Sequence, residues 1–92
     1  MNVKDLVREI SRRTKYTQKD ISVIVESMLD VIKDTVASGE DVKIKDFGSF
    51  HKRTYFGRIT HLPSGEKIEV PDFSNIKFVA REDFKRRVRE LN

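Results

Sequence analysis

The residues with the clearest chemical potential lie between Phe47 and Val70, where cations alternate with aromatic and apolar side chains. Lysine and arginine pair with phosphates, which raises affinity without reading base sequence and makes binding weaken as salt rises. Arg58 is also suited to a narrow minor groove, where the negative potential is enhanced. The predicted phosphate contacts are Lys52, Arg53, Arg58 and Lys67.

The same segment turns at Leu62-Pro63-Ser64-Gly65. Proline or leucine at such a tip can insert between base pairs, unstack one step and kink a duplex. Proline followed by serine and glycine is also ordinary turn chemistry. The residues alone leave Pro63 as either an intercalating wedge or a plain turn residue. They also leave Tyr55 and Phe56 either stacking on sugars or packing along the ribbon.

The chain lacks the groupings that catalysis or metal binding needs. It has no cysteine, and its two histidines, His51 and His61, stand ten residues apart with no carboxylate at metal-ligand spacing. We expect both to be solvated or DNA-facing side chains. No glycine-rich phosphate loop follows a predicted strand, and no serine lies in a nucleophile motif. The sequence therefore predicts no enzyme, cofactor, metal ion or small-molecule substrate.

Periodicity places the basic segment on a two-stranded ribbon within a larger set of elements. Apolar residues at spacings of three and four predict helices, the first capped by Asn2 and the second by Thr17. Alternating apolar residues predict strands, with Pro71 at an edge or a kink. The predicted helices are 3–14, the segment from Thr17 to Gly39, and 81–91, and the predicted strands are 42–45, 47–59, 67–70 and 76–79.

This order is typical of an α+β fold with an N-terminal helical hairpin, a three-stranded antiparallel sheet extended into a β-ribbon arm, and a short C-terminal helix. The 92 residues make one domain, with a body of residues 1–50 and 74–92 and an arm of about residues 51–73. A body of about 70 residues is marginal alone. The long apolar stripe of the second helix is either intramolecular core or the contact with a second subunit, and we favour a dimer.

Charge is unevenly distributed along the chain. Residues 1–50 carry nine Lys/Arg and nine Asp/Glu, whereas residues 51–92 carry ten against six and hold the whole net charge of +4. A basic half joined to a neutral half favours a polyanion-binding surface on a structural base, although mildly basic small proteins are common. No apolar run approaches the ~18 residues of a membrane span, and the N-terminus lacks a signal-peptide core. We therefore expect a soluble intracellular protein with no membrane partner.

These residues give the chain a family resemblance over essentially its whole length. The segment Phe47-Gly48-Ser49-Phe50 is similar to the Phe-Gly-x-Phe element of the bacterial HU and integration host factor family. Pro63 lies thirteen residues after Phe50, the position of the arm-tip proline in that family. Further positions that resemble the family are Asn2, Leu6, Ile10, Thr17, Glu26, Ser27, Gly39, Ser64, Gly65, Phe78, Phe84, Lys85 and Val88.

The resemblance implies a histone-like architectural protein that binds, bends or condenses double-stranded DNA. It implies an intertwined homodimer, or a heterodimer with a paralogue, whose β-arms embrace DNA through the minor groove with Pro63 intercalating. It places the protein in the bacterial cytoplasm, on the nucleoid or as a phage-encoded protein in a bacterial host. The predicted DNA-binding residues are Lys52, Arg53, Tyr55, Arg58, His61, Leu62, Pro63, Lys67, Arg81 and Lys85. The predicted dimer interface comprises Ile24, Met28, Leu29, Ile32, Phe47, Phe50 and Phe78.

The arm departs from the pattern of the family it resembles. Tyr55 and His61 stand where arginines are usual, and the turn after Pro63 is one residue shorter. Asp46 replaces a glycine before Phe47. These differences motivate an alternative function, in which the dimeric body is kept and the aromatic arm contacts protein or recognises a specific or distorted DNA structure.

Overall fold

The computed structural model describes residues 1–91, which form two compact units: Met1–Asp34, and the chain from Thr35 onward. Contacts within each unit explain its structure. The predicted α+β class is confirmed, with two N-terminal helices, a group of strands and a C-terminal helix, although the structure has five strands where four were predicted.

The first unit is a helical hairpin. Helix α1 (Val3–Thr14) begins at Asn2, whose side chain accepts a hydrogen bond from the Asp5 backbone at 3.1 Å. The Asp5 carboxylate accepts one from the Asn2 backbone at 3.0 Å, which completes a reciprocal cap. Helix α2 (Gln18–Ala37) follows after three residues, and the Thr17 hydroxyl accepts a hydrogen bond from the Asp20 backbone at 3.2 Å. Both predicted caps are confirmed.

The second unit is built on a three-stranded antiparallel sheet in the order β1 (Val42–Ile44), β2 (Gly48–Tyr55) and β5 (Phe73–Ala80), followed by helix α3 (Glu82–Glu90). The ring of Phe47 stacks on Phe84 of α3 with centroids 5.2 Å apart. Phe47 and Phe50 also pack edge-on against Phe78, at 5.5 and 4.9 Å. These aromatic contacts join α3 to the sheet.

Gly48 lies where the β2 backbone passes under the Phe78 ring. A Cβ atom added there would stand 2.5 Å from Phe78 Cε2 and 2.8 Å from the Val79 carbonyl oxygen. Real Cβ atoms do not approach other atoms so closely. The second position of the Phe-Gly-Ser-Phe element is therefore glycine because the sheet leaves no room for a side chain.

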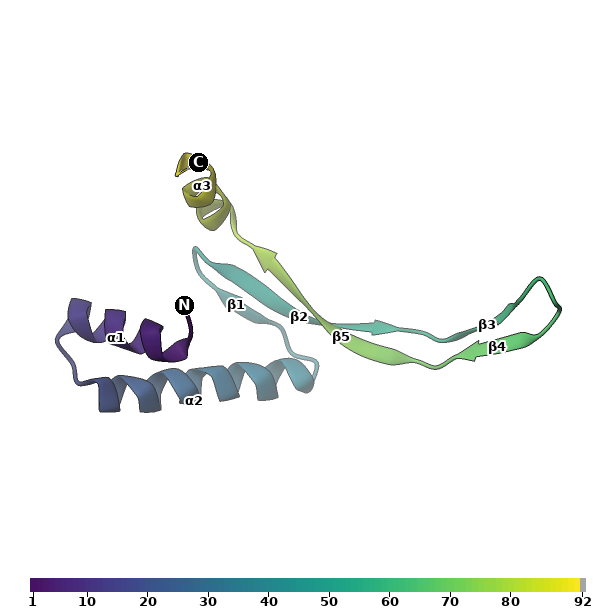
Figure 1. The fold of residues 1–92 in the computed structure, drawn as a ribbon, viewed down its shortest axis with the longest axis horizontal. Helices are drawn as coiled ribbons and strands as arrows, with labels where there is room; N and C mark the ends of the chain where they lie inside the picture. The colour runs from purple at the N-terminus through teal and green to yellow at the C-terminus, as the bar shows by residue number, and fades with distance from the viewer. Residues whose placement is uncertain (92) are drawn as a thin grey trace. The chain divides into compact units, whose positions relative to one another are not determined.

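Strands β3 (Arg58–His61) and β4 (Lys67–Val70) form a ribbon that extends away from β1 and α3 (Figure 1). The β2–β5 ladder runs from Gly48↔Ala80 to Tyr55↔Phe73, and the β3–β4 ladder runs from Arg58↔Val70 to His61↔Lys67. Two residues are skipped on each strand between the ladders. The register is therefore unchanged across the gap, and the four strands make one ribbon with a break in its hydrogen bonding.

The break corrects the prediction of one strand over residues 47–59. Continuing the register places Gly57 opposite Pro71, which has no backbone N–H to donate. The Gly57 N–H instead donates to the Asp72 carboxylate. A Cβ on Gly57 would lie 2.9 Å from the Pro71 carbonyl carbon and closer still to the Val70 oxygen. The predicted last strand, 76–79, was also too short, since β5 begins at Phe73.

The described residues bury very little apolar side chain. The buried apolar residues are Val7, Ile21 and Val36, with 3–5% of their surface exposed. Ile24 and Met28 on α2 remain 67% and 51% exposed. Burial of apolar surface is the main force that stabilises a fold, so a surface this open requires a partner to cover it.

Candidate nucleic-acid interface

The cations of the ribbon are distributed over both of its faces. Successive side chains on a strand alternate, so Lys52 and Arg53 lie on opposite faces of β2, and Arg58 lies on the opposite face of the β3–β4 ribbon from His61 and its partner Lys67. Arg53, Arg58 and Lys67 are exposed, and none of them pairs with a carboxylate within residues 1–91. Guanidinium and ammonium groups without an acidic partner are available for phosphate.

Lys52 differs from the other ribbon cations because it has an internal partner. Its Nζ donates a hydrogen bond to the Ala37 carbonyl oxygen at 3.0 Å. Helix α2 has no basic residue in its last turn, so Lys52 supplies the positive charge that stabilises a helix C-terminus. The ammonium group thus ties β2 to the end of α2. In this arrangement Lys52 is a weaker candidate for phosphate than Arg53 or Arg58.

The tip of the ribbon is a hydrogen-bonded turn with Pro63 at its second position. The Gly65 N–H donates to the Leu62 carbonyl at 2.8 Å, and the Leu62 N–H donates to the Glu66 carbonyl at 2.9 Å. Gly65 has φ +91°, a left-handed conformation that glycine adopts without strain. Pro63 is exposed, and Leu62 beside it is 40% exposed. The turn is closed, and it presents an apolar pair to the outside.

Tyr55 and Phe56, whose packing the sequence did not determine, have different surroundings in the structure. Tyr55 stacks on Phe73, its cross-strand partner, with centroids 4.9 Å apart and planes 18° from parallel. Phe56 stands opposite Asp72 in the break and is 82% exposed. Tyr55 therefore packs along the ribbon, whereas Phe56 has no comparable ring against it.

The expectation that His51 is solvated or DNA-facing is wrong. Its side chain is only 24% exposed, with Nδ1 3.1 Å from the Asp41 carboxylate and Nε2 2.7 Å from the Ser49 hydroxyl. This connectivity is also that of a serine hydrolase triad. Ser49 is only 8% exposed, however, so its hydroxyl is poorly placed to reach an outside carbonyl. The three residues fasten the start of β1 to β2.

The flank residues Arg81 and Lys85 lie at the start of α3. The Arg81 backbone donates to the Phe47 carbonyl at 2.9 Å, which fixes the position where the helix begins. Neither side chain forms an ion pair within residues 1–91. By contrast, Arg86 pairs with Asp83 at 2.8 Å and Arg89 with Glu82 at 2.6 Å. The basic face of α3 is therefore partly neutralised, and Arg81, Lys85 and Arg87 are its cations without an ion pair within residues 1–91.

Asp46 occupies a strained position next to α3. Its φ is +61°, in the left-handed region where glycine is favoured, which explains why glycine suits this place in the β1–β2 turn. A hydrogen bond with the Asp83 carboxyl raises the pKa of Asp46 above its ordinary value. The raised pKa disfavours the negative charge of Asp46 beside the Arg81 flank.

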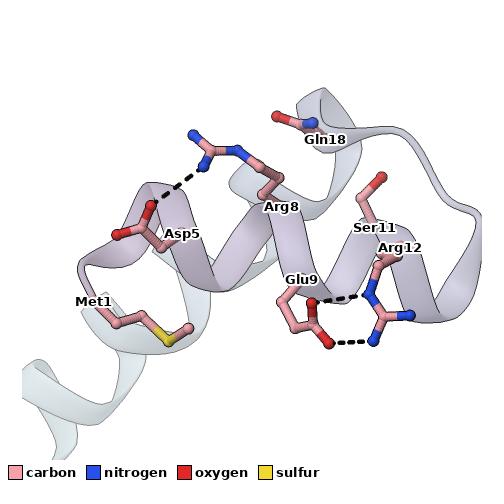
Figure 2. Close-up of a pocket in the computed structure, with 7 residues that line it drawn as sticks. All are labelled: Met1, Asp5, Arg8, Glu9, Ser11, Arg12 and Gln18. Carbon is pink, nitrogen blue, oxygen red and sulfur yellow. Dashed lines mark hydrogen bonds and ion pairs between the residues drawn. The ribbon is translucent and has the colours of Figure 1, made fainter.

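A shallow hollow along α1 is lined by charged side chains that satisfy one another (Figure 2). Glu9 accepts hydrogen bonds from Arg12 Nε and Arg13 Nε, both at 3.0 Å. These bonds lower the pKa of Glu9 from 4.5 to about 2. Arg8 pairs with Asp5 at 3.4 Å. The charged side chains of the hollow therefore pair with one another, and they are not arranged as a binding or catalytic site.

Glu9→Gln is expected to flatten the loss of stability in acid. Between pH 4.5 and about 2 the unfolded chain binds a proton at Glu9 that the folded chain excludes, so wild-type stability falls as pH falls through this range. The effect is modest because the partners are exposed. Thermal melts above and within the range measure it, with Glu26→Gln as the control at a residue without an ion pair in the described chain. Identical pH profiles for wild type and Glu9→Gln would contradict the prediction.

Other kinds of site find little support in residues 1–91. That part of the chain brings together no group of three or more His, Asp or Glu side chains suited to a metal ion. None of its helices has the length and apolar character needed to cross a bilayer.

Comparison with known proteins points in one direction. Residues 1–89 match the family model described as "Bacterial DNA-binding protein". The chain is 30% identical over 86 residues to DNA-binding protein HU-1 of Halalkalibacterium halodurans, covering 92% of this chain and 96% of that protein. It is 34% identical over 71 residues to integration host factor subunit alpha of an Anaeromyxobacter species, covering 76% and 72% of the two chains. The cocrystal structure of Anabaena HU with DNA superposes with a TM-score of 0.81 at 30% identity, covering 96% of this chain and 97% of that one.

Proposed function

Because the chain belongs to the bacterial DNA-binding protein family, with HU and integration host factor among its relatives, we propose that it is an architectural protein that binds and bends duplex DNA. The observation that carries the proposal is an exposed ribbon whose Arg53, Arg58 and Lys67 have no acidic partner in the described chain. Such a ribbon fits a DNA groove and gains affinity from phosphates. Membership of this DNA-binding family does not suggest an enzyme.

The functional unit is a dimer. The apolar stripe of α2, including Ile24 and Met28, and the half-exposed Phe47 and Phe78 are left open by the single chain. A two-fold partner that presents the same surfaces would cover them. We assign the interface to the predicted set, in which Leu29, Ile32 and Phe50 are already partly covered. A homodimer is the simplest form, and a paralogous chain could supply the second half.

The root and the tip of each arm have different roles in DNA binding. Arg53, Arg58, His61 and Lys67 line the ribbon as phosphate and minor-groove contacts, while Arg81 and Lys85 contact the DNA flanks. Pro63, with Leu62 beside it, inserts between base pairs and kinks the duplex. Tyr55 acts indirectly, because its stack with Phe73 stiffens the ribbon. The protein acts on the bacterial nucleoid, and the same surface would serve a phage-encoded protein in a bacterial host.

The proposal is tested by gel shifts on linear, nicked and cruciform DNA at low and high salt. We expect binding to all three, with a steep loss of affinity as salt rises. Salt-independent binding, or the absence of binding to every form, would refute the function.

Pro63→Ala is expected to reduce bending more than affinity. A wedge residue kinks DNA by roughly 20–90°, whereas phosphate contacts along the arm do not depend on it. Energy transfer between the ends of a labelled duplex measures the bend, and Ser64→Ala is the control at the next position of the turn. A bend angle unchanged in Pro63→Ala would show that Pro63 is only a turn residue.

A further inference from the structure

We propose that Phe56 is a second nucleic-acid contact of the arm, a stacking site for an unstacked base in gapped or otherwise distorted DNA. The inference rests on the proposed DNA-binding function and extends it to a residue at the break in the ribbon. It assigns the arm two apolar contacts, one at the tip and one set back toward the body.

The first argument is that the exposed side chain of Phe56 contributes little to the packing of the fold. Its ring is 82% exposed, more than any other large apolar side chain except Met1 and Leu91 near the chain ends. Its cross-strand position is taken by Asp72, whose carboxylate is occupied with the Gly57 N–H. The adjacent Tyr55, in contrast, stacks on Phe73. An exposed phenyl ring with no packing partner is free to contact a ligand.

The second argument is the backbone that holds the ring. Gly57 and Pro71 bring the two strands so close that a Cβ on Gly57 would lie 3.0 Å from the Asp72 backbone nitrogen. The bond from Gly57 to Asp72 replaces the missing ladder bond and holds the break together. Phe56 therefore lies on a narrow section of the arm whose two strands are held together by this bond. A bulky nucleic-acid strand can approach this section closely.

The third argument is charge. Arg58 follows Phe56 by two residues, nearer the tip, and Arg58 has no acidic partner in the described chain. A cation beside a flat aromatic ring is the combination that binds exposed bases, because the cation holds the phosphate while the ring stacks on the base. A protein partner would not need this cation, so the charge favours nucleic acid as the occupant.

The position also sets where the contact falls. Phe56 precedes Pro63 by seven residues, so the two apolar contacts are separated by roughly 23 Å along an extended strand. A base unstacked at that distance from the kink is reached without moving the tip. A gap places such bases within reach at little energetic cost, because they are already unpaired.

The test compares the affinity of the dimer for an intact duplex and for the same duplex with a short single-stranded gap, at one salt concentration. Phe56→Ala is expected to weaken binding to the gapped duplex about tenfold and to affect the intact duplex much less. Phe56→Tyr should retain the preference, whereas Phe56→Leu should lose it because leucine has no ring to stack. Ile59→Ala is the matched control, since Ile59 is an apolar residue of the same arm and is 60% exposed. Moving the gap along the duplex, with 2-aminopurine in it as the fluorescent base, locates the contact.

Equal losses on both duplexes, or none on either, would overturn the inference while leaving the proposed function intact. A marked fall in the melting temperature of Phe56→Ala would also overturn it, because the ring would then belong to an internal or subunit contact. Wild-type protein that binds neither duplex would instead refute the proposed function itself.

Discussion

Gly48→Ala is expected to destabilise the folded protein by about 3 kcal/mol, a large fraction of the total stability of a small domain. The new methyl group would stand 2.5 Å from Phe78 Cε2 and 2.8 Å from the Val79 carbonyl oxygen. The carbonyl belongs to the sheet ladder, and the ring is held between Phe47 and Phe50. Neither neighbour can move without breaking the contacts that join α3 to the sheet.

Urea unfolding followed by circular dichroism measures the effect, and Gly39→Ala provides the control. Gly39 has φ +99° with no atom within 4 Å of an added Cβ, so alanine there introduces backbone strain without a collision. We expect it to cost only about 1–2 kcal/mol. A Gly48→Ala protein as stable as Gly39→Ala would show that the sheet can open around Phe78.

Removing the three unpaired cations of the arm is expected to have the largest effect on DNA binding. The combined substitution Arg53→Gln, Arg58→Gln and Lys67→Gln removes three phosphate contacts from each arm. With two arms in a dimer, the slope of log affinity against log salt should become shallower by about five, at roughly 0.9 per contact. The folded state should be unaffected, because these side chains have no ion-pair partner within residues 1–91.

Anisotropy titrations over a range of salt concentrations give this slope directly. Arg86→Gln is the control, because Arg86 already pairs with Asp83 at 2.8 Å and should contribute little to the slope. If the triple variant kept the wild-type slope, phosphate binding would have to lie elsewhere, and the α3 flank with Arg81 and Lys85 would be the next surface to test.

The parts of the fold that follow from local chemistry were predictable from the sequence. Caps at Asn2 and Thr17 and the turn at Pro63 depend on residues within a few positions of one another. The close approach at Gly48, by contrast, is caused by the Phe78 ring of a strand distant in the sequence. The unbroken strand over 47–59 was wrong, because the pairing of Gly57 with Pro71 depends on the bond from Leu62 to Glu66, and a two-residue loop at Pro63-Ser64 would have paired Gly57 with Val70.

Features that depend on contacts between distant segments could not be predicted from the sequence. Asp41 contacts His51 only because the β1–β2 turn folds one strand back on the other. Their spacing in the sequence does not predict this pair. The bond from Lys52 to the Ala37 carbonyl joins a strand to a helix end fifteen residues away. Both contacts turn side chains that looked available for DNA toward the protein itself.

The constant register of the ribbon limits how an arm of this kind can change length. A single residue inserted into either strand would move every side chain beyond it to the opposite face, and would exchange the places of Arg58 and Ile59. Insertions and deletions are therefore harmless only at the tip, or when both strands gain or lose residues together in pairs. The turn at Leu62-Pro63-Ser64-Gly65 lies at the place where this rule permits a change. Grafted arms of other lengths should be tolerated when they obey the same rule, and chimaeric proteins could be designed on that basis.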